Sequence, residues 1–213
     1  METITEEQMA KWKFILLKYK FALDEVNTKL RILNEEFQML HDHNPIEHIK
    51  SRIKTPKSIL EKMERKGLDF TYENAEAHIK DIAGIRIICS FVTDIYKIYE
   101  MIKNQDDIHV IEVKDYIKEP KPNGYESFHL LIDIPIFLTD RTIRVPVELQ
   151  IRTIAMDFWA SLEHKIYYKF DKDVPKELTE ELKEAAVAIH ELDYKMNNIK
   201  EKMELFKLEQ FRV

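Results

Sequence analysis

The stretch TIRVPVELQIRT, residues 142–153, alternates apolar and polar side chains over the length of one β-strand. Successive side chains of a strand point to opposite faces, so the composition of each face follows directly from the sequence. One face carries the apolar residues Val145, Val147, Leu149 and Ile151. The other face carries Arg144, Glu148, Gln150 and Arg152. Pro146 has no N–H to donate to a sheet, which indicates a strand start or an edge position.

Other runs on both sides of this strand predict further elements. Strand-like apolar or alternating patterns occupy residues 82–92, 109–117 and 128–137. Helical patterns occupy residues 55–66, 94–104 and 155–170. The mixture predicts a single domain with an α/β (α+β) core, and neither an internal repeat nor a linker suggests a second domain.

Two long helices are predicted at the ends of the chain, from Glu6 to about His41 and from Lys176 to about Gln210. In both, apolar residues recur in steps of four and three, which keeps them on one side of a helix. Each apolar seam either covers the core of the domain or packs against the other seam or a second subunit. Because two narrow seams have matching length, we expect a homo-oligomer.

The overall composition excludes several classes of protein. Hydrophobic residues make up 45% and charged residues 34% of the chain, which is typical of a folded protein rather than a disordered one. A single cysteine, Cys89, excludes an internal disulfide and a cysteine-rich zinc site. No run is apolar for the ~18 residues that span a membrane, so we expect a cytoplasmic protein without membrane contact. The net charge of −6 means that phosphate recognition has to depend on a local cluster of positive charge.

Such a cluster lies in residues 48–67, HIKSRIKTPKSILEKMERKG. Thr55 and Pro56 predict a helix start, with Arg52 and Lys54 leading into an N-terminus that favours an anion. The helix would carry Ser58, Lys62 and Arg65 on one side. Residues of this kind suit a polyphosphate site, although a solvated basic face balanced by acidic neighbours has the same pattern.

The stretch DIAGIRIICSF, residues 81–91, places a charge inside an apolar strand. Arg86 needs a partner there, either a carboxylate of the protein or a ligand ring and its phosphates. Gly84 permits a bulge or a close approach of the backbone. Asp81 is either a turn residue or an oxygen ligand for a magnesium ion that also binds nucleotide phosphates.

The stretch PKPNGYESFH, residues 120–129, gathers polar groups before an apolar strand. Lys121 offers a charge for phosphate, Tyr125 a ring on which a base can stack, and His129 a hydrogen-bonding group. Asn123 followed by Gly124 is also a common turn signal, so a simple turn explains the pair equally well.

Taken in order, four motifs closely resemble the synthetase domain of the RelA/SpoT-type alarmone synthetases. They are RIK…S…K…R (from residue 52), DIAGIRI (81–87), YIKEPKPNGYESFH (116–129) and VELQIRT…FWASLEHKIYYK (147–169). The single-domain length points to a small alarmone synthetase, similar to the RelP subfamily. The resemblance implies a nucleotidyltransferase-like mixed β-sheet and one (p)ppGpp synthetase domain over residues 1–213. Its parts would be an N-terminal helix in 1–44, a catalytic core in 45–175 and a C-terminal helix in 176–213.

The resemblance also implies an activity, that of a GTP diphosphokinase. Enzymes of this family transfer the β,γ-pyrophosphate of ATP to the 3′-hydroxyl of GTP or GDP, which gives (p)ppGpp and AMP in the stringent response. By similarity, Arg52 and Arg86 would enclose the adenine, and the ATP phosphates would contact Lys54, Ser58, Lys62 and Arg65. Asp81 would bind Mg²⁺, and Glu148 would bind the metal or deprotonate the 3′-hydroxyl. Tyr125 would stack on guanine, and the remaining acceptor contacts would come from Lys114, Lys121, Asn123, His129 and Gln150.

The same resemblance implies a homotetramer that synthesises alarmone without hydrolysing it, and RNA binding is not expected. Two other functions fit the residues. One is an inactive nucleotide-binding regulator, which the presence of Asp81, Glu148 and Tyr125 disfavours. The other is a nucleotidyltransferase acting on RNA ends, which would release pyrophosphate instead of AMP.

Overall fold

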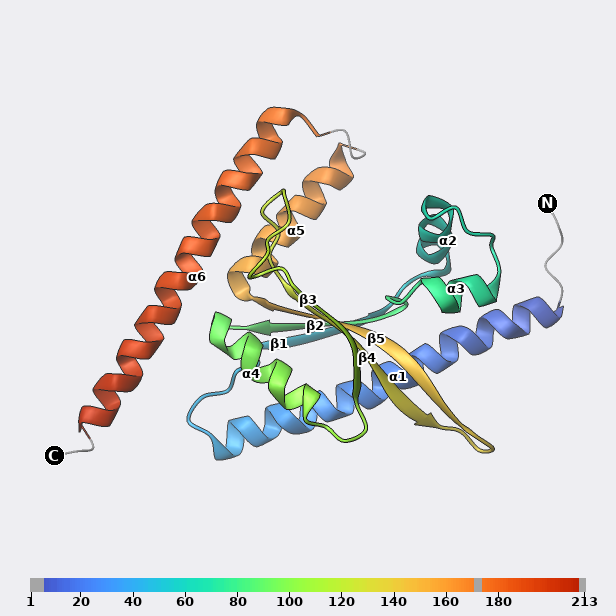
Figure 1. Ribbon diagram of the computed structural model, residues 1–213, viewed down its shortest axis with the longest axis horizontal. Helices are drawn as coiled ribbons and strands as arrows, with labels where there is room; N and C mark the ends of the chain where they lie inside the picture. The colour runs from blue at the N-terminus through green and yellow to red at the C-terminus, as the bar shows by residue number, and fades with distance from the viewer. Residues whose placement is uncertain (1–5, 171–173, 211–213) are drawn as a thin grey trace.

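The structure, a computed structural model, describes residues 6–170 and 174–210 and is built on a five-stranded sheet (Figure 1). The strands are β1 (His48–Ile53), β2 (Ala83–Cys89), β3 (His109–Asp115), β4 (Phe128–Phe137) and β5 (Thr142–Thr153). Their order is β1-β2-β5-β4-β3, with β2 and β5 parallel and the other neighbours antiparallel. The predicted mixed sheet in an α/β fold is confirmed.

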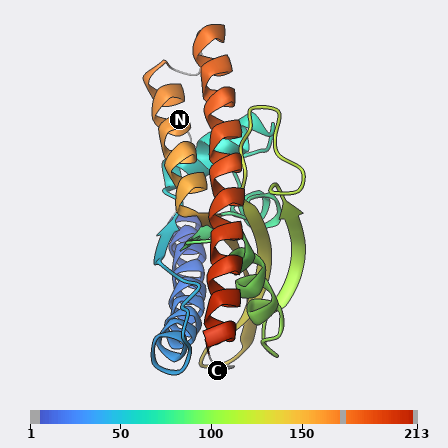
Figure 2. The ribbon, with the colours of Figure 1, turned by 90° about the vertical axis from the view of Figure 1, so that its left-hand side faces the viewer.

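Helices cover one face of this sheet and extend from its ends. Their bounds are α1 (Glu6–Leu40), α2 (Pro56–Arg65), α3 (Tyr72–His78), α4 (Val92–Lys103), α5 (Ile154–Lys169) and α6 (Lys176–Gln210). Helices α1 and α4 lie on the same side of the sheet, and α5 and α6 form an antiparallel pair that rises from one end of it (Figures 1 and 2). Among the described residues, no helix is both long and apolar enough to cross a membrane.

The core lies between the sheet and helices α1 and α4. It follows from the apolar face of β5, since Val145, Val147 and Leu149 have no exposed surface. The buried residues packed with them include Tyr19, Leu30, Ile85, Ile95, Ile98 and Leu130. Burying the apolar face of the central strand leaves its charged face free, and this second face carries the candidate site.

The two terminal helices use their apolar seams differently. The seam of α1 covers the core, because Tyr19, Val26 and Leu30 are buried against the sheet. This is the simpler of the two explanations considered for that helix. On α6, Leu192 and Ile199 each expose 49% of their surface, so much of that seam stays uncovered. The structure therefore leaves more of the seam of α6 than of the seam of α1 available for a partner.

The position of Pro146 agrees with its interpretation as an edge residue. Strand β2 pairs with β5 only from Glu148 onward, so the β2 side of Pro146 is open. On β4, Pro135 lies beyond Asp133, where pairing with β3 ends. Both prolines therefore lie in the arm of the β4–β5 hairpin that extends past its neighbours (Figure 1).

Candidate active site

One row of side chains crosses the uncovered face of all five strands. Residues paired directly across neighbouring strands project from the same face of a sheet. The row runs through Lys50, Arg86, Gln150, His129 and Lys114 in strand order. Strands from distant parts of the sequence thus bring four of the predicted site residues onto a single line, together with Lys50.

A second row, two residues further along, contains Arg52, Gly84 and Glu148. Gly84 has no side chain to fill the space between its neighbours, and a cavity of about 210 Å³ lies there. Its lining includes Asp81, Arg86 and Gln150 as well as this row. We call it the donor cavity, since it gathers the residues predicted to contact adenine and metal.

Asp81 lies at the centre of the positive charge beside the donor cavity. Its Oδ2 atom is 2.9 Å from the Nζ atoms of both Lys54 and Lys62. Burial alone would raise the pKa of the Asp81 carboxyl, but the two lysines outweigh it and lower that pKa below its usual value. The Oδ1 atom is buried and has no hydrogen-bond partner among the described residues. A buried, ionised oxygen of this kind fits a hard cation such as Mg²⁺.

A second cavity, of about 200 Å³, lies on the other side of Glu148. Its lining includes Glu112, Lys114, Tyr116, Lys121, His129 and Glu148. We call it the acceptor cavity. Among the described residues, Glu148 alone lines both cavities, so a single carboxylate separates the predicted ATP and GTP sides.

Two neutral hydrogen-bonding groups lie directly beside the carboxylate of Glu148. Gln150 donates from Nε2 to Glu148 Oε2 over 3.0 Å, and His129 Nδ1 lies 3.8 Å from Oε1. Burial, with Arg152, Lys121 and Lys114 nearby, lowers the pKa of His129 to about 3. His129 is therefore uncharged at neutral pH, and the carboxylate of Glu148 is not neutralised by an imidazolium.

The depressed pKa of His129 predicts a pH dependence of stability. Between pH 6.5 and about 3 the unfolded chain binds a proton at this residue that the folded chain does not bind. The free energy of unfolding should therefore fall as the pH falls through this window. Urea unfolding between about pH 7.5 and 5.5 should show a steeper decline for the native chain than for His129→Gln. Parallel declines would contradict the assignment of a neutral, buried His129.

The loop from residue 116 to 127 carries the predicted guanine contact. Gly124 N–H donates to the Lys121 carbonyl over 2.8 Å, which closes a four-residue turn with Pro122 in its second position. Gly124 has a φ of +86°, a conformation that favours glycine. The Asn-Gly pair is thus a turn within a long β3–β4 connection, not a two-residue hairpin.

Tyr125 lies next to this turn, and two cations lie close to its ring. Lys121 Nζ and Arg152 Cζ are 4.7 Å and 5.1 Å from the centre of its ring. Its hydroxyl lies 2.9 Å from His129 Nε2, so it contacts the wall of the acceptor cavity through that residue. The predicted residues on this side therefore form one connected group.

Three further predicted residues line neither cavity and contact other residues of the protein. Ser58 Oγ accepts a hydrogen bond from Thr55 at the start of α2. Arg65 donates to the Glu61 carbonyl of its own helix and lines neither cavity. Asn123 donates to Glu163 and accepts from the backbone N–H of Tyr125, so its contacts hold the loop.

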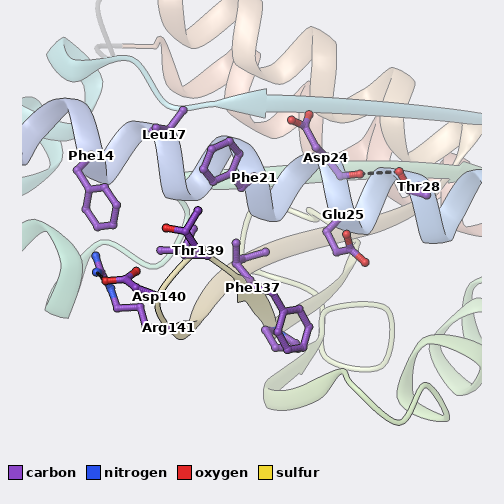
Figure 3. Close-up of a pocket in the computed structure, with 13 residues that line it drawn as sticks. Phe14, Leu17, Phe21, Asp24, Glu25, Thr28, Phe137, Thr139, Asp140 and Arg141 are labelled. Carbon is purple, nitrogen blue, oxygen red and sulfur yellow. Dashed lines mark hydrogen bonds and ion pairs between the residues drawn. The ribbon is translucent and has the colours of Figure 1, made fainter.

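A larger cavity of about 810 Å³ lies away from the candidate site (Figure 3). It opens between α1 and the end of the β4–β5 hairpin, beside Phe14, Phe21 and Phe137. None of the predicted site residues lines it. The candidate site is therefore identified by its charged residues and by Glu148, which lines both the donor and the acceptor cavity. The volume of a cavity does not identify it.

The fold and the site together define a class of protein, an enzyme that transfers a phosphate-containing group between two nucleotides. Comparison with known proteins narrows this class. Residues 51–173 match the family described as "Region found in RelA / SpoT proteins", and the chain belongs to that family.

Full-length relatives of similar size are known. The chain is 56% identical over 204 residues to GTP pyrophosphokinase YwaC of Bacillus subtilis, covering 96% of this chain and 95% of the relative. The crystal structure of small alarmone synthetase 2 from B. subtilis matches with a TM-score of 0.82 and 56% identity, over 90% of this chain and 98% of the other. Small alarmone synthetase 1 from B. subtilis, bound to its product pppGpp, matches with a TM-score of 0.84 and 38% identity, over 90% and 97% of the two chains. The resemblance to small alarmone synthetases and the prediction of a GTP pyrophosphokinase are confirmed.

Proposed function

We propose that this protein transfers the β,γ-pyrophosphate of ATP to the 3′-hydroxyl of GTP or GDP in the stringent response. The observation that carries the proposal is the position of Glu148 between the donor and acceptor cavities. An in-line transfer needs the attacking 3′-hydroxyl and the leaving AMP on opposite sides of the β-phosphorus, so the two nucleotides have to meet at one reaction centre. A carboxylate common to both cavities meets that requirement.

On the donor side, charge and unsatisfied polar groups support binding of ATP. Arg52 and Arg86 both line the donor cavity, and Arg86 Nε is buried without a partner among the described residues. We assign these two guanidinium groups to the adenine. Lys54 and Lys62, now paired with Asp81, would turn to the phosphates, with Ser58 at the start of α2. Arg65 would join them only if its side chain leaves the Glu61 carbonyl.

Mg²⁺ would be held by Asp81 and Glu148, which both line the donor cavity. Two carboxylates together with substrate phosphates are a common ligand set for this ion. When bound, Mg²⁺ supplies neutralisation of the phosphate charge. Glu148 would also accept the proton of the 3′-hydroxyl, because His129 and Gln150 place no positive charge beside it.

On the acceptor side, Tyr125 would stack on guanine, and Lys114 and Lys121 would contact the phosphates of the acceptor. His129 and Gln150 are placed to hydrogen-bond the ribose, since both side chains lie beside the carboxylate of Glu148. Asn123 would act by holding the loop, as its contacts to Glu163 and Tyr125 suggest.

The small product distinguishes this proposal from transfer of a nucleotidyl group. Incubation with Mg²⁺, ATP and either GTP or GDP should yield AMP and a 3′-pyrophosphorylated guanosine nucleotide, separable by anion-exchange chromatography. Release of pyrophosphate in place of AMP would overturn the proposal in favour of nucleotidyl transfer. The two acceptors, compared at equal concentration, would establish the preferred one.

We further propose a cytoplasmic homotetramer assembled through the terminal helices, with α6 contributing most of the apolar contact. Exposed apolar residues on α6 include Leu192, Tyr194, Met196, Ile199, Met203, Leu205 and Phe206. Uncovered apolar area of this extent on one helix is typical of an interface.

Light scattering of the native chain should therefore give four times the chain mass. The double variant Ile199→Glu, Met203→Glu should reduce this mass, since it places charge in the apolar strip. Lys202→Glu, a change at an exposed residue between them, should leave the mass unchanged. A monomeric native chain at micromolar concentration would contradict the proposed tetramer.

A further inference from the structure

Arg152 and Asp157 form a largely buried ion pair that the reaction described above does not use. The side chain of Arg152, at the end of β5, is 5% exposed, and that of Asp157, in the first turn of α5, is 18% exposed. Their Nη1 and Oδ1 atoms are 3.1 Å apart. The same Oδ1 atom lies 3.0 Å from Nη1 of Arg86. One carboxylate oxygen thus holds two guanidinium groups, and one of these lines the donor cavity.

The other donors of Arg152 bind residues of β5 and of the loop before β4. Its Nη2 atom donates to the Tyr125 hydroxyl over 2.5 Å and to Gln150 Oε1 over 3.2 Å. Its Nε atom donates to Ser127 Oγ over 3.3 Å. Arg152 itself lines neither cavity. Of its partners, Tyr125 and Gln150 are predicted acceptor contacts; Tyr125 reaches the acceptor cavity through His129, and Gln150 lines the donor cavity. Arg152 therefore contacts residues of the protein, not a place that the acceptor would occupy.

These contacts make a continuous path from one nucleotide side to the other, from Arg86 through Asp157, Arg152 and Tyr125 to His129. Burying a charged pair costs free energy unless its hydrogen bonds are well satisfied. In this pair, the donors of Arg152 have acceptors on the strand, the loop and the helix. Such a network has few alternative arrangements, so it fixes the groups at its two ends.

We propose that Arg152 and Asp157 are positioning residues that act on different side chains. Arg152 positions Tyr125, whereas Asp157 positions both Arg86 and Arg152. This inference rests on the proposed assignment of adenine to Arg86 and guanine to Tyr125. It goes beyond that assignment because neither residue touches a substrate. Substitutions of the two residues should therefore change the affinities for the two nucleotides in different ways.

The test measures the dissociation constants of two ligands separately by calorimetry, a non-hydrolysable ATP analogue and GDP. Arg152→Lys should weaken GDP binding about tenfold or more, because a lysine cannot replace the forked contacts, and should leave the ATP analogue unchanged. Asp157→Ala should weaken both ligands by a similar factor, since it releases Arg86 as well. Asp157→Asn, which keeps an oxygen acceptor, should recover part of the loss for both.

A double-mutant cycle separates positioning from a general loss of structure. Tyr125→Phe removes the hydroxyl through which Arg152 acts, so adding Arg152→Lys to it should cost GDP binding less than in the native chain. Lys200→Met is the matched control, because it removes a buried partner of Asp94 on α4, and neither residue lines either cavity. It should lower the melting temperature without changing either dissociation constant.

The outcomes separate this inference from the function on which it rests. A native chain that binds neither the ATP analogue nor GDP would overturn the proposed function. If the native chain binds both, equal losses for the two ligands in Arg152→Lys would overturn the positioning assignment alone. Fully additive effects of Arg152→Lys and Tyr125→Phe would do the same.

Discussion

Replacing Glu148 with glutamine should lower the rate of AMP formation about a thousandfold while the chain still folds and binds ATP. General acid–base catalysis alone contributes about 10²–10⁴ in rate, and a neutral amide neither accepts the 3′-hydroxyl proton nor attracts a metal ion strongly. The amide oxygen of glutamine can still accept the hydrogen bond that Gln150 donates, so the local structure should persist. Initial rates with saturating ATP and GTP, beside a melting curve, measure both effects.

Glu112 provides the matched control for this prediction. It is the other glutamate that lines the acceptor cavity, but it lies on the edge strand β3, pairs with Lys114, and has no part in the donor cavity. Glu112→Gln removes a similar charge from the same cavity and should change the rate only a few-fold. Two results would contradict a catalytic role for Glu148. One is a Glu148→Gln variant that keeps most of its activity, and the other is a Glu112→Gln variant that loses as much activity as Glu148→Gln.

The sequence predicted the central part of the fold because its strongest patterns are local. The alternation in residues 142–153 matches β5, whose apolar face is buried, and the seam of residues 6–41 matches α1. Strand β1 was missed, because His48–Ile53 is a polar edge strand that buries little and reads as part of a basic cluster. Helix α3 was also missed, since its seven residues are too few for a clear period.

The site was predicted as a set of residues but not as an arrangement. Which residues face one another depends on the parallel pairing of β2 with β5, and these strands are separated by more than fifty residues. The place of Glu148 between two cavities follows from that pairing and has no local signal. Asp157 carries no signal either, because an aspartate in the first turn of a helix is ordinary. Only the folded chain brings it to Arg86 and Arg152.

Substituting alanine for Gly124 should both destabilise the chain and weaken binding of the guanosine acceptor. The residue has a φ of +86°, and a Cβ atom there would lie 2.5 Å from the Cβ of Ala186 on α6. A left-handed backbone and an overpacked contact together cost roughly 2–5 kcal/mol. The loop cannot simply move away, because α6 also holds the adjacent Glu126 through His190, over 2.9 Å. Any relief of the clash should therefore displace Tyr125, and GDP should bind more weakly than to the native chain.

Two comparisons within the chain separate backbone strain from the clash. Gly67 also has a left-handed φ, of +65°, but a Cβ there meets nothing within 4 Å, so Gly67→Ala should cost only about 1–2 kcal/mol and leave GDP binding unchanged. In an Ala186→Gly background, Gly124→Ala should lose its clash and cost about as much as Gly67→Ala. Urea unfolding of the four chains of this cycle, with GDP calorimetry, measures both quantities. A cost for Gly124→Ala that is the same with and without the Ala186 methyl group would show that α6 does not position the acceptor loop.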